Sequence, residues 1–290
     1  MKKIRLMLLI FAVLTTAVFL ATVTASAELS PSGTVLADND EIFICITGFK
    51  YEQENDTYTV EVYIENRCDV AIEAGAEKVG VNGIIVDGYM YDVMAAGRKS
   101  IAYLSISAST LRQLEMDPDC ITFSLYANKT YDGTMRESIV NTDAAFYPEG
   151  TAAEEIKSKS FDDFPITQFD FENEFIRVRE LDARPMNGDF IYQIDFLVEN
   201  KCDFDFNLDF GNFRINGSDM SVYCYCLIPA GMKAVAHAWV SADEMGDINV
   251  YDVDTVSATL LLYEHADGAL SGMADSPFFA YPIHFNPAKG

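Results

Sequence analysis

The sequence YTVEVYIENRCD at residues 58–69 returns as YQIDFLVENKCD at residues 192–203. The offset of 134 residues that relates these two stretches also relates Asn-Gly at 82–83 to Asn-Gly at 216–217. It relates Ala-Gly-x-Lys at 96–99 to the same pattern at 230–233 as well. One constant offset across turn residues and apolar positions alike indicates a tandem duplication of one folding unit.

Apolar residues alternate with polar ones inside each copy. Val60, Val62 and Ile64 alternate in the first copy, and the second copy carries Phe-Asp-Phe-Asn-Leu-Asp-Phe at 204–210. This period of two is typical of half-buried strands, and Asn-Gly and Asp-Gly pairs between them favour tight turns. The predicted strands of the first copy cover residues 41–50, 58–66, 71–81, 89–94, 99–106, 120–127, 134–140 and 144–147.

A short helix is expected in each copy. Ser-Ala-Asp-Glu at 241–244 has capping-box spacing, and its counterpart begins at Ser107 and runs to Asp117-Pro118, where proline stops it. Seven or eight strands in about 110 residues, with turns at this spacing, are typical of an immunoglobulin-like sandwich. The sequence therefore predicts an all-β protein of two tandem immunoglobulin-like antiparallel β-sandwich domains, each with one short helix.

Five segments follow from these patterns. Basic residues at positions 2, 3 and 5, an apolar run from 6 to 21 and Ala-Ser-Ala at 25–27 predict a secretory signal peptide; the alternative is a retained anchor. No later apolar run is long enough to cross a membrane. The predicted organisation is a signal peptide at 1–27, a flexible leader at 28–40, one sandwich at 41–148, a polar linker at 149–164 and a second sandwich at 165–290.

The order of these framework elements resembles one known class of module. The elements are Glu-Asn-x-Cys-Asp, Asn-Gly, Ala-Gly-x-Lys and the Leu-Tyr pairs at 125–126 and 262–263. They resemble poorly characterised immunoglobulin-like modules of exported Gram-positive bacterial proteins. The resemblance implies a secreted or surface-associated β-sandwich protein, and it carries no site residues and no reaction across.

Net charge excludes several partners. Residues 1–27 hold three positive charges and no negative one, so removing them takes the net charge from −25 to −28. A chain this acidic repels nucleic acid and anionic lipid. We therefore expect neither partner, and no membrane span in the mature chain.

Motifs for catalysis are missing from the sequence. There is no Gly-x-Ser-x-Gly elbow, His-Glu-x-x-His motif, phosphate-binding glycine loop or dinucleotide fingerprint. All three histidines lie in the second copy, so no His-based site is duplicated. We predict a protein that is not an enzyme, although paired carboxylates leave no signature and keep a hydrolase open.

Four tyrosines are the candidate ligand-binding residues: Tyr89, Tyr91, Tyr223 and Tyr225. Each pair places two rings on one side of equivalent strands, and exposed tyrosines stack on sugars or anchor protein partners. The alternative is packing in the core, which the apolar residues between them, Met90 and Cys224, favour.

Acidic residues offer one candidate calcium site, at Asp247, Asp252, Asp254 and Asp267. Calcium needs six to eight oxygens converging from loops, and these residues follow the second short helix. The acidic row at 203–209 lies along one strand and is more consistent with a solvated face. No other cofactor is expected.

Six cysteines in an exported protein permit disulfides, but only Cys68 and Cys202 are equivalent in the two copies. We predict mostly reduced, buried thiols. The alternatives are a Cys45–Cys120 or Cys68–Cys120 bridge and a Cys202–Cys224 bridge. Cys224 and Cys226, joined by His237, could also hold a soft metal, but core packing is favoured.

The expected function is that of a secreted, non-enzymatic interaction module at or outside the cell envelope. Its partner would be an extracellular protein or glycan. The alternatives are an extracellular hydrolase with a carboxylate or metal site, and a purely structural spacer. The sequence does not define the oligomeric state.

Overall fold

The computed structural model describes residues 33–131, 135–148, 159–165, 167–186, 188, 190–224, 226–265 and 274–287. Residues Thr34–Gly290 form one compact unit. The predicted signal peptide, residues 149–158 of the linker, Tyr225 and Asp267 lie outside the described residues.

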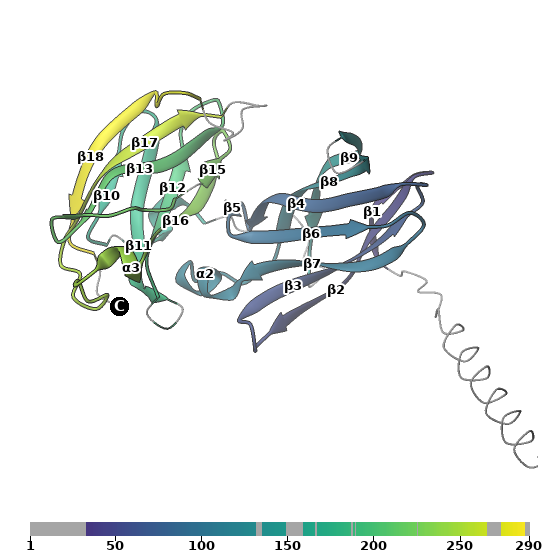
Figure 1. The fold of residues 1–290 in the computed structure, drawn as a ribbon, viewed down its shortest axis with the longest axis horizontal. Helices are drawn as coiled ribbons and strands as arrows, with labels where there is room; N and C mark the ends of the chain where they lie inside the picture. Colours follow the sequence, from purple (N-terminus) through teal and green to yellow (C-terminus); the bar gives the residue numbers. More distant parts are fainter. Residues whose placement is uncertain are drawn as a thin grey trace, which may run out of the picture. The chain divides into compact units, whose positions relative to one another are not determined.

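The fold is nearly all β, in open sheets (Figure 1). The first copy contains β1 (Thr34–Asp38), β2 (Ile42–Glu52), β3 (Thr57–Asn66), β4 (Ala71–Val81), β5 (Ile84–Ile85), β6 (Gly88–Met94), β7 (Lys99–Ser107), α2 (Ala108–Gln113), β8 (Ile121–Tyr131) and β9 (Met135–Phe146). A 3₁₀ turn, η2 (Phe161–Asp163), follows it.

The second copy repeats much of this order. It contains β10 (Asp170–Glu172), β11 (Ile176–Met186), β12 (Ile191–Asn200), β13 (Phe206–Ile215), β14 (Ser218–Asp219), β15 (Cys226–Ile228), β16 (Lys233–Ser241), α3 (Ala242–Met245), β17 (Val256–Glu264) and β18 (Phe279–Phe285). The three strands β2–β3–β7 of the first copy pair antiparallel in the same register as β11–β12–β16 of the second. Glu61 therefore lies opposite Tyr103 as Asp195 lies opposite His237.

Three expectations from the sequence are wrong in detail. Residues 34–38, placed in a flexible leader, form β1 and pair with β2. The separate strands at 134–140 and 144–147 are one strand, because the residues between them keep pairing with β8. Helix α2 is capped by Ser107 as expected but ends at Gln113, before Asp117-Pro118, since Glu115 takes a positive φ of 48°.

Equivalent asparagines fix the ends of β3 and β12. The Asn66 amide donates to the carbonyls of Val70, Met94 and Ala95 and accepts from the Cys68 backbone N–H. The Asn200 amide makes the same kind of contacts in the second copy, with the carbonyls at 204 and 228 and the N–H at 202. The Glu-Asn-x-Cys-Asp motif is therefore a framework element, in which one amide satisfies buried backbone groups.

Two apolar clusters fill the unit, and they are not confined to one copy each. Leu197 and Val235 of the second copy lie in the first cluster, and Ile85 packs against the second. Phe161 and Phe164, at the end of the polar linker, are also buried in the first cluster. Strand β5 pairs in parallel with β16, which brings the two copies into backbone contact.

Candidate functional site

Three of the four candidate tyrosines are exposed, and the fourth, Tyr225, lies outside the described residues. Tyr89 is 67% exposed, Tyr91 45% and Tyr223 54%, whereas the residues between them, Met90 and Cys224, are buried. The expectation that these rings pack in the core is therefore wrong. Alternate residues of a strand point to opposite sides, and only the side holding Met90 and Cys224 faces the apolar interior.

Tyr223 stacks on Trp239, the single tryptophan of the chain. The ring centroids are 4.4 Å apart and the planes meet at 18°. Backbone hydrogen bonds in both directions, at 2.9 and 3.0 Å, hold these residues opposite each other. Trp239 is 36% exposed, so the pair forms a rigid aromatic surface that still reaches solvent.

A hollow of about 610 Å³ lies beside this pair, and we call it the aromatic hollow. Its polar groups are the side chains of Asp87, Gln193, Asp209 and His237. The remaining lining residues are Val222, Tyr223, Cys224, Cys226, Val235 and Trp239. Aromatic faces with a few converging polar groups are the usual composition of a binding site for a small molecule or a sugar.

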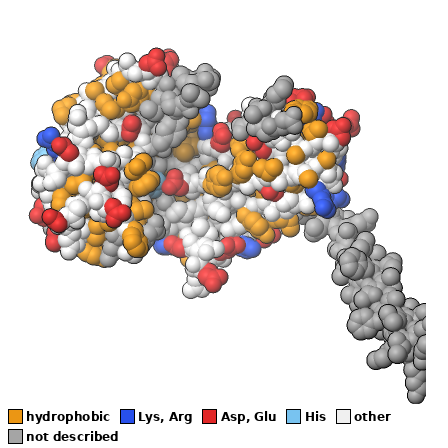
Figure 2. Space-filling model, in the orientation of Figure 1, with side chains coloured by type: hydrophobic (Ala, Val, Ile, Leu, Met, Phe, Trp, Pro, Cys, Tyr) orange, Lys and Arg blue, Asp and Glu red, His pale blue; other side chains and the backbone are white. Residues whose placement is uncertain are grey.

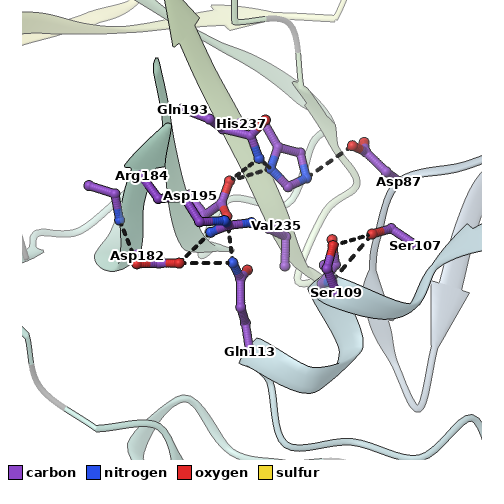
Figure 3. A network of polar contacts seen from close by, with 12 residues as sticks. Asp87, Ser107, Ser109, Gln113, Asp182, Arg184, Gln193, Asp195, Val235 and His237 are labelled. Atoms are coloured by element: carbon purple, nitrogen blue, oxygen red, sulfur yellow. Dashed lines mark hydrogen bonds and ion pairs between the residues drawn. The ribbon is translucent and has the colours of Figure 1, made fainter. Parts of the chain in front are cut away.

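Asp87 reaches the aromatic hollow from the first copy. Ile84 and Ile85 pair with Lys233 and Ala234 at the start of β16, and the chain then runs on beside that strand to Asp87. The Asp87 carboxylate points at His237, with Oδ2 3.0 Å from Nε2 (Figure 3). This ion pair depends on the contact between the two copies.

His237 is held in its charged form. Burial alone would lower its pKa, but its contacts with the Asp195 and Asp87 carboxylates outweigh burial and raise the pKa well above the usual value. Its Nδ1 lies 2.5 Å from Asp195 Oδ1. The imidazole therefore carries both protons at neutral pH and acts as a fixed cation rather than as a general base.

Asp195 is the centre of the network that holds His237 (Figure 3). It is fully buried, and its carboxylate accepts from Gln193 at 2.7 Å, from Arg184 at 2.9 Å and from Gln113 of α2 at 2.9 Å. Burial alone would raise its pKa, but the His237 hydrogen bond and the nearby positive charges lower it. The buried charge is thus fully paired.

Burial favours the protonated forms of three other titratable groups of the hollow. It raises the pKa of Asp209, which also accepts the Phe210 N–H, and of the Cys224 and Cys226 thiols. All six cysteines are described and all are free, so none of the alternative bridges forms. Protonated thiols are poor metal ligands.

The described residues contain no group of three or more His, Cys, Asp or Glu side chains that could hold a metal ion. Cys224, Cys226 and His237, the possible soft-metal ligands, therefore do not form such a group. In the candidate calcium loop, the Asn216 side chain donates to the Asp252 carbonyl and accepts the Asp254 N–H. These bonds give the loop a structural role of its own, while the fourth candidate, Asp267, lies outside the described residues.

Sequence reasoning finds Tyr223 and brings His237 next to Cys224 and Cys226 only as a possible metal ligand, and it misses Trp239 and Asp87. One signal was available. At the shared offset, His237 and Trp239 replace Tyr103 and Ser105, so the second copy departs from the first at two alternate positions of one strand. No local pattern gives the contact with Asp87, because it depends on pairing between the copies.

Comparison with known proteins leaves the chain without an assigned family. No protein-family model and no curated protein matches it. The crystal structure of the YadV chaperone is 12% identical over 84% of this chain and 98% of that chain, with a TM-score of 0.26. A protein of unknown function from Porphyromonas gingivalis W83 is 11% identical over 80% and 92%, with a TM-score of 0.22.

A conserved domain protein from Bacillus anthracis is 9% identical over 89% of this chain and 90% of that chain, with a TM-score of 0.29. TM-scores this low support no inference about the present chain. Separately, the described part of the chain has no helix long and apolar enough to cross a membrane.

Proposed function

We propose that this chain is an exported, non-enzymatic binding protein that holds a neutral glycan in the aromatic hollow, at or outside the cell envelope. The two copies would be tandem immunoglobulin-like β-sandwich domains. The observation that carries the proposal is the exposed Tyr223–Trp239 stack beside the converging side chains of Gln193, His237 and Asp87.

The chemistry of the hollow suits a sugar. A rigid aromatic face packs against the apolar C–H face of a sugar ring, and little side-chain entropy is lost because the two rings are already stacked. Carboxylate, amide and imidazolium groups at the rim offer acceptors and donors to hydroxyl groups. Gln193 and His237 are themselves fixed by Asp195, which preorganises them.

Charge favours a neutral ligand. The chain carries a net charge of −25, and acidic side chains are scattered over the face seen in Figure 2. Anionic polysaccharides would be repelled by this field. A partner strand is not expected to add at β16 itself, because β16 pairs with β12 on one side and with β5 and Tyr223 on the other.

The test is co-sedimentation of residues 28–290 with insoluble neutral polysaccharides, with calcium and with a chelator in parallel. We expect the wild type to pellet with one of these polysaccharides. Trp239→Ala should weaken the binding free energy by about 1.5–3 kcal/mol, roughly 10- to 100-fold in Kd. Tyr103→Ala is the matched control, since Tyr103 is exposed and lies on the equivalent strand β7, outside the hollow. Equal pelleting of both variants would refute the site.

Calcium enters the same experiment. If Asp247, Asp252, Asp254 and Asp267 bind a calcium ion that glycan binding needs, pelleting would be lost in chelator. Equal pelleting with calcium and with chelator would remove calcium from the proposal. This arm tests the acidic loop independently of the aromatic hollow.

A second candidate function, hydrolysis of the bound glycan, is favoured by one observation. Asp209, whose pKa is raised by burial, and Asp87 are both carboxyl groups of the aromatic hollow. Glycoside hydrolysis uses a pair of carboxyl groups, one of which has a raised pKa. Release of reducing ends by the wild type, lost in Asp209→Asn, would support hydrolysis; no release supports binding alone.

A further inference from the structure

A second hollow lies at the place in the first copy that corresponds to the aromatic hollow. Tyr89 pairs with Ser105 as Tyr223 pairs with Trp239, each position shifted by 134 residues. The hollow at Tyr89 has a volume of about 440 Å³ and is lined by the hydroxyl-bearing residues Ser105, Ser107 and Ser109. We call it the serine hollow.

Asp87 joins the two hollows. Asp87 lines the aromatic hollow, the serine hollow and a third hollow of about 840 Å³. The lining of the third hollow also includes Tyr89 of the first copy and Val235 of the second. Figure 3 shows the Asp87 side chain directed at His237, and the Ser107 backbone N–H donates to the Asp87 carbonyl. The lining is therefore continuous from the Tyr223–Trp239 stack to Tyr89.

The polar groups along this path suit one ligand chemistry throughout. The serine hollow offers hydroxyl groups, and the Ser107 and Ser109 hydroxyls lie 2.9 Å apart. Asp87 keeps 71% of its side chain exposed while it pairs with His237, so it can still accept from a ligand hydroxyl. Tyr89, 67% exposed, supplies a second ring.

The path from Trp239 to Tyr89 runs through His237 and Asp87. His237 and Trp239 are two residues apart on β16, about 7 Å along the strand, and Asp87 and Tyr89 are at most about 7 Å apart. The 3.0 Å ion pair between His237 and Asp87 joins these two segments, so the hollows at Trp239 and at Tyr89 share a rim at Asp87.

From these observations we infer that the ligand is a linear, neutral polysaccharide that spans both copies, with Asp87 at the middle of its path. This inference rests on the proposed function and adds a ligand class to it. A single sugar or a chain end would occupy the aromatic hollow alone. A linear chain would use Tyr89 as well.

The test measures affinity against chain length by calorimetry. The probes are neutral oligosaccharides of two, four and six sugars from the cello, malto, manno and N-acetylated chito series. We expect one series to bind residues 28–290 about 10-fold or more tightly at six sugars than at two. Tyr89→Ala should remove most of that gain and leave the two-sugar affinity unchanged, whereas Tyr103→Ala should change neither.

The outcomes separate the two proposals. An affinity that does not rise with length, or a rise that Tyr89→Ala leaves intact, would overturn the spanning ligand while the aromatic hollow stands. Trp239→Ala should weaken binding at every length. Binding unaffected by Trp239→Ala, or no binding in any series, would overturn both the spanning ligand and the glycan site.

Discussion

Replacing Asp195 by Asn should destabilise the protein far more than the equivalent change in the first copy. Asp195 is fully buried and balances the charges of His237 and Arg184, and its carboxylate also accepts from Gln113 of the other copy. Asn is nearly the same size, so packing is preserved. It removes the negative charge and puts an NH₂ group where only acceptors fit.

The structure sets the size of the effect. Removing one partner of a buried ion pair typically costs about 3–5 kcal/mol, because the other charge stays buried and uncompensated. The matched position is Glu61, whose side chain is 29% exposed and pairs with the half-exposed Lys50. Glu61→Gln should cost less than about 1 kcal/mol.

The same pair makes stability depend on pH. The pKa of His237 is raised to about 10, so its contribution is complete below its ordinary value of 6.5 and disappears as pH rises through about 10. The pKa of Asp195 is lowered from 3.8 to about 2, so its contribution is complete above 3.8 and disappears as pH falls through about 2. Wild-type stability should decline from pH 6.5 to 10, and Asp195→Asn should lose much of that decline.

The assay is equilibrium unfolding in urea, followed by circular dichroism at pH 6.5 and pH 9.5, for wild type, Asp195→Asn and Glu61→Gln. A loss of 3–5 kcal/mol corresponds to roughly 6–20 °C in Tm for a chain of this size. Equal free energies of unfolding for the two variants at pH 6.5 would refute the buried network as described.

Three further predictions can be tested by urea unfolding. Asn66→Ala and Asn200→Ala should each cost about 2–3 kcal/mol, because each leaves buried backbone groups unpaired; a loss under 1 kcal/mol in either would contradict their equivalence. Arg179→Met removes a buried guanidinium that pairs with the partly exposed Asp170 and donates to the carbonyls of Phe161 and Phe164, and it should cost about 3–5 kcal/mol. The half-exposed Arg214→Met should cost under about 1 kcal/mol. Gly75→Ala should cost about 1–3 kcal/mol, since a Cβ would lie 2.8 Å from the backbone of β6; unchanged stability would show that the sheet yields there.

The repeated framework could be predicted from the sequence because its causes are local. Alternating apolar residues give the strands at 57–66 and 71–81, and the Ser107 side chain caps α2 as its position predicts. The constant offset also predicts that Asn66 and Asn200 play the same part, and their hydrogen bonds agree. Each of these features is determined by residues that lie close together in the sequence.

The site could be predicted only in part because its causes are long-range. The sequence offers Tyr223 as a candidate, but the apolar residues Met90 and Cys224 predict strands buried on both sides, whereas these two residues line only the inner side. The stack on Trp239 depends on the register between a loop and β16. Asp87 arrives through parallel pairing between the copies, which no local pattern encodes.

The most direct test of the glycan site uses the single tryptophan of the chain. Because Trp239 lies in the aromatic hollow, its fluorescence reports that hollow and no other part of the protein. Titration of residues 28–290 with the soluble oligosaccharide that binds in calorimetry should give a saturable change in emission, with the same midpoint. Unchanged emission at saturating ligand would place the binding site elsewhere and contradict the proposed function.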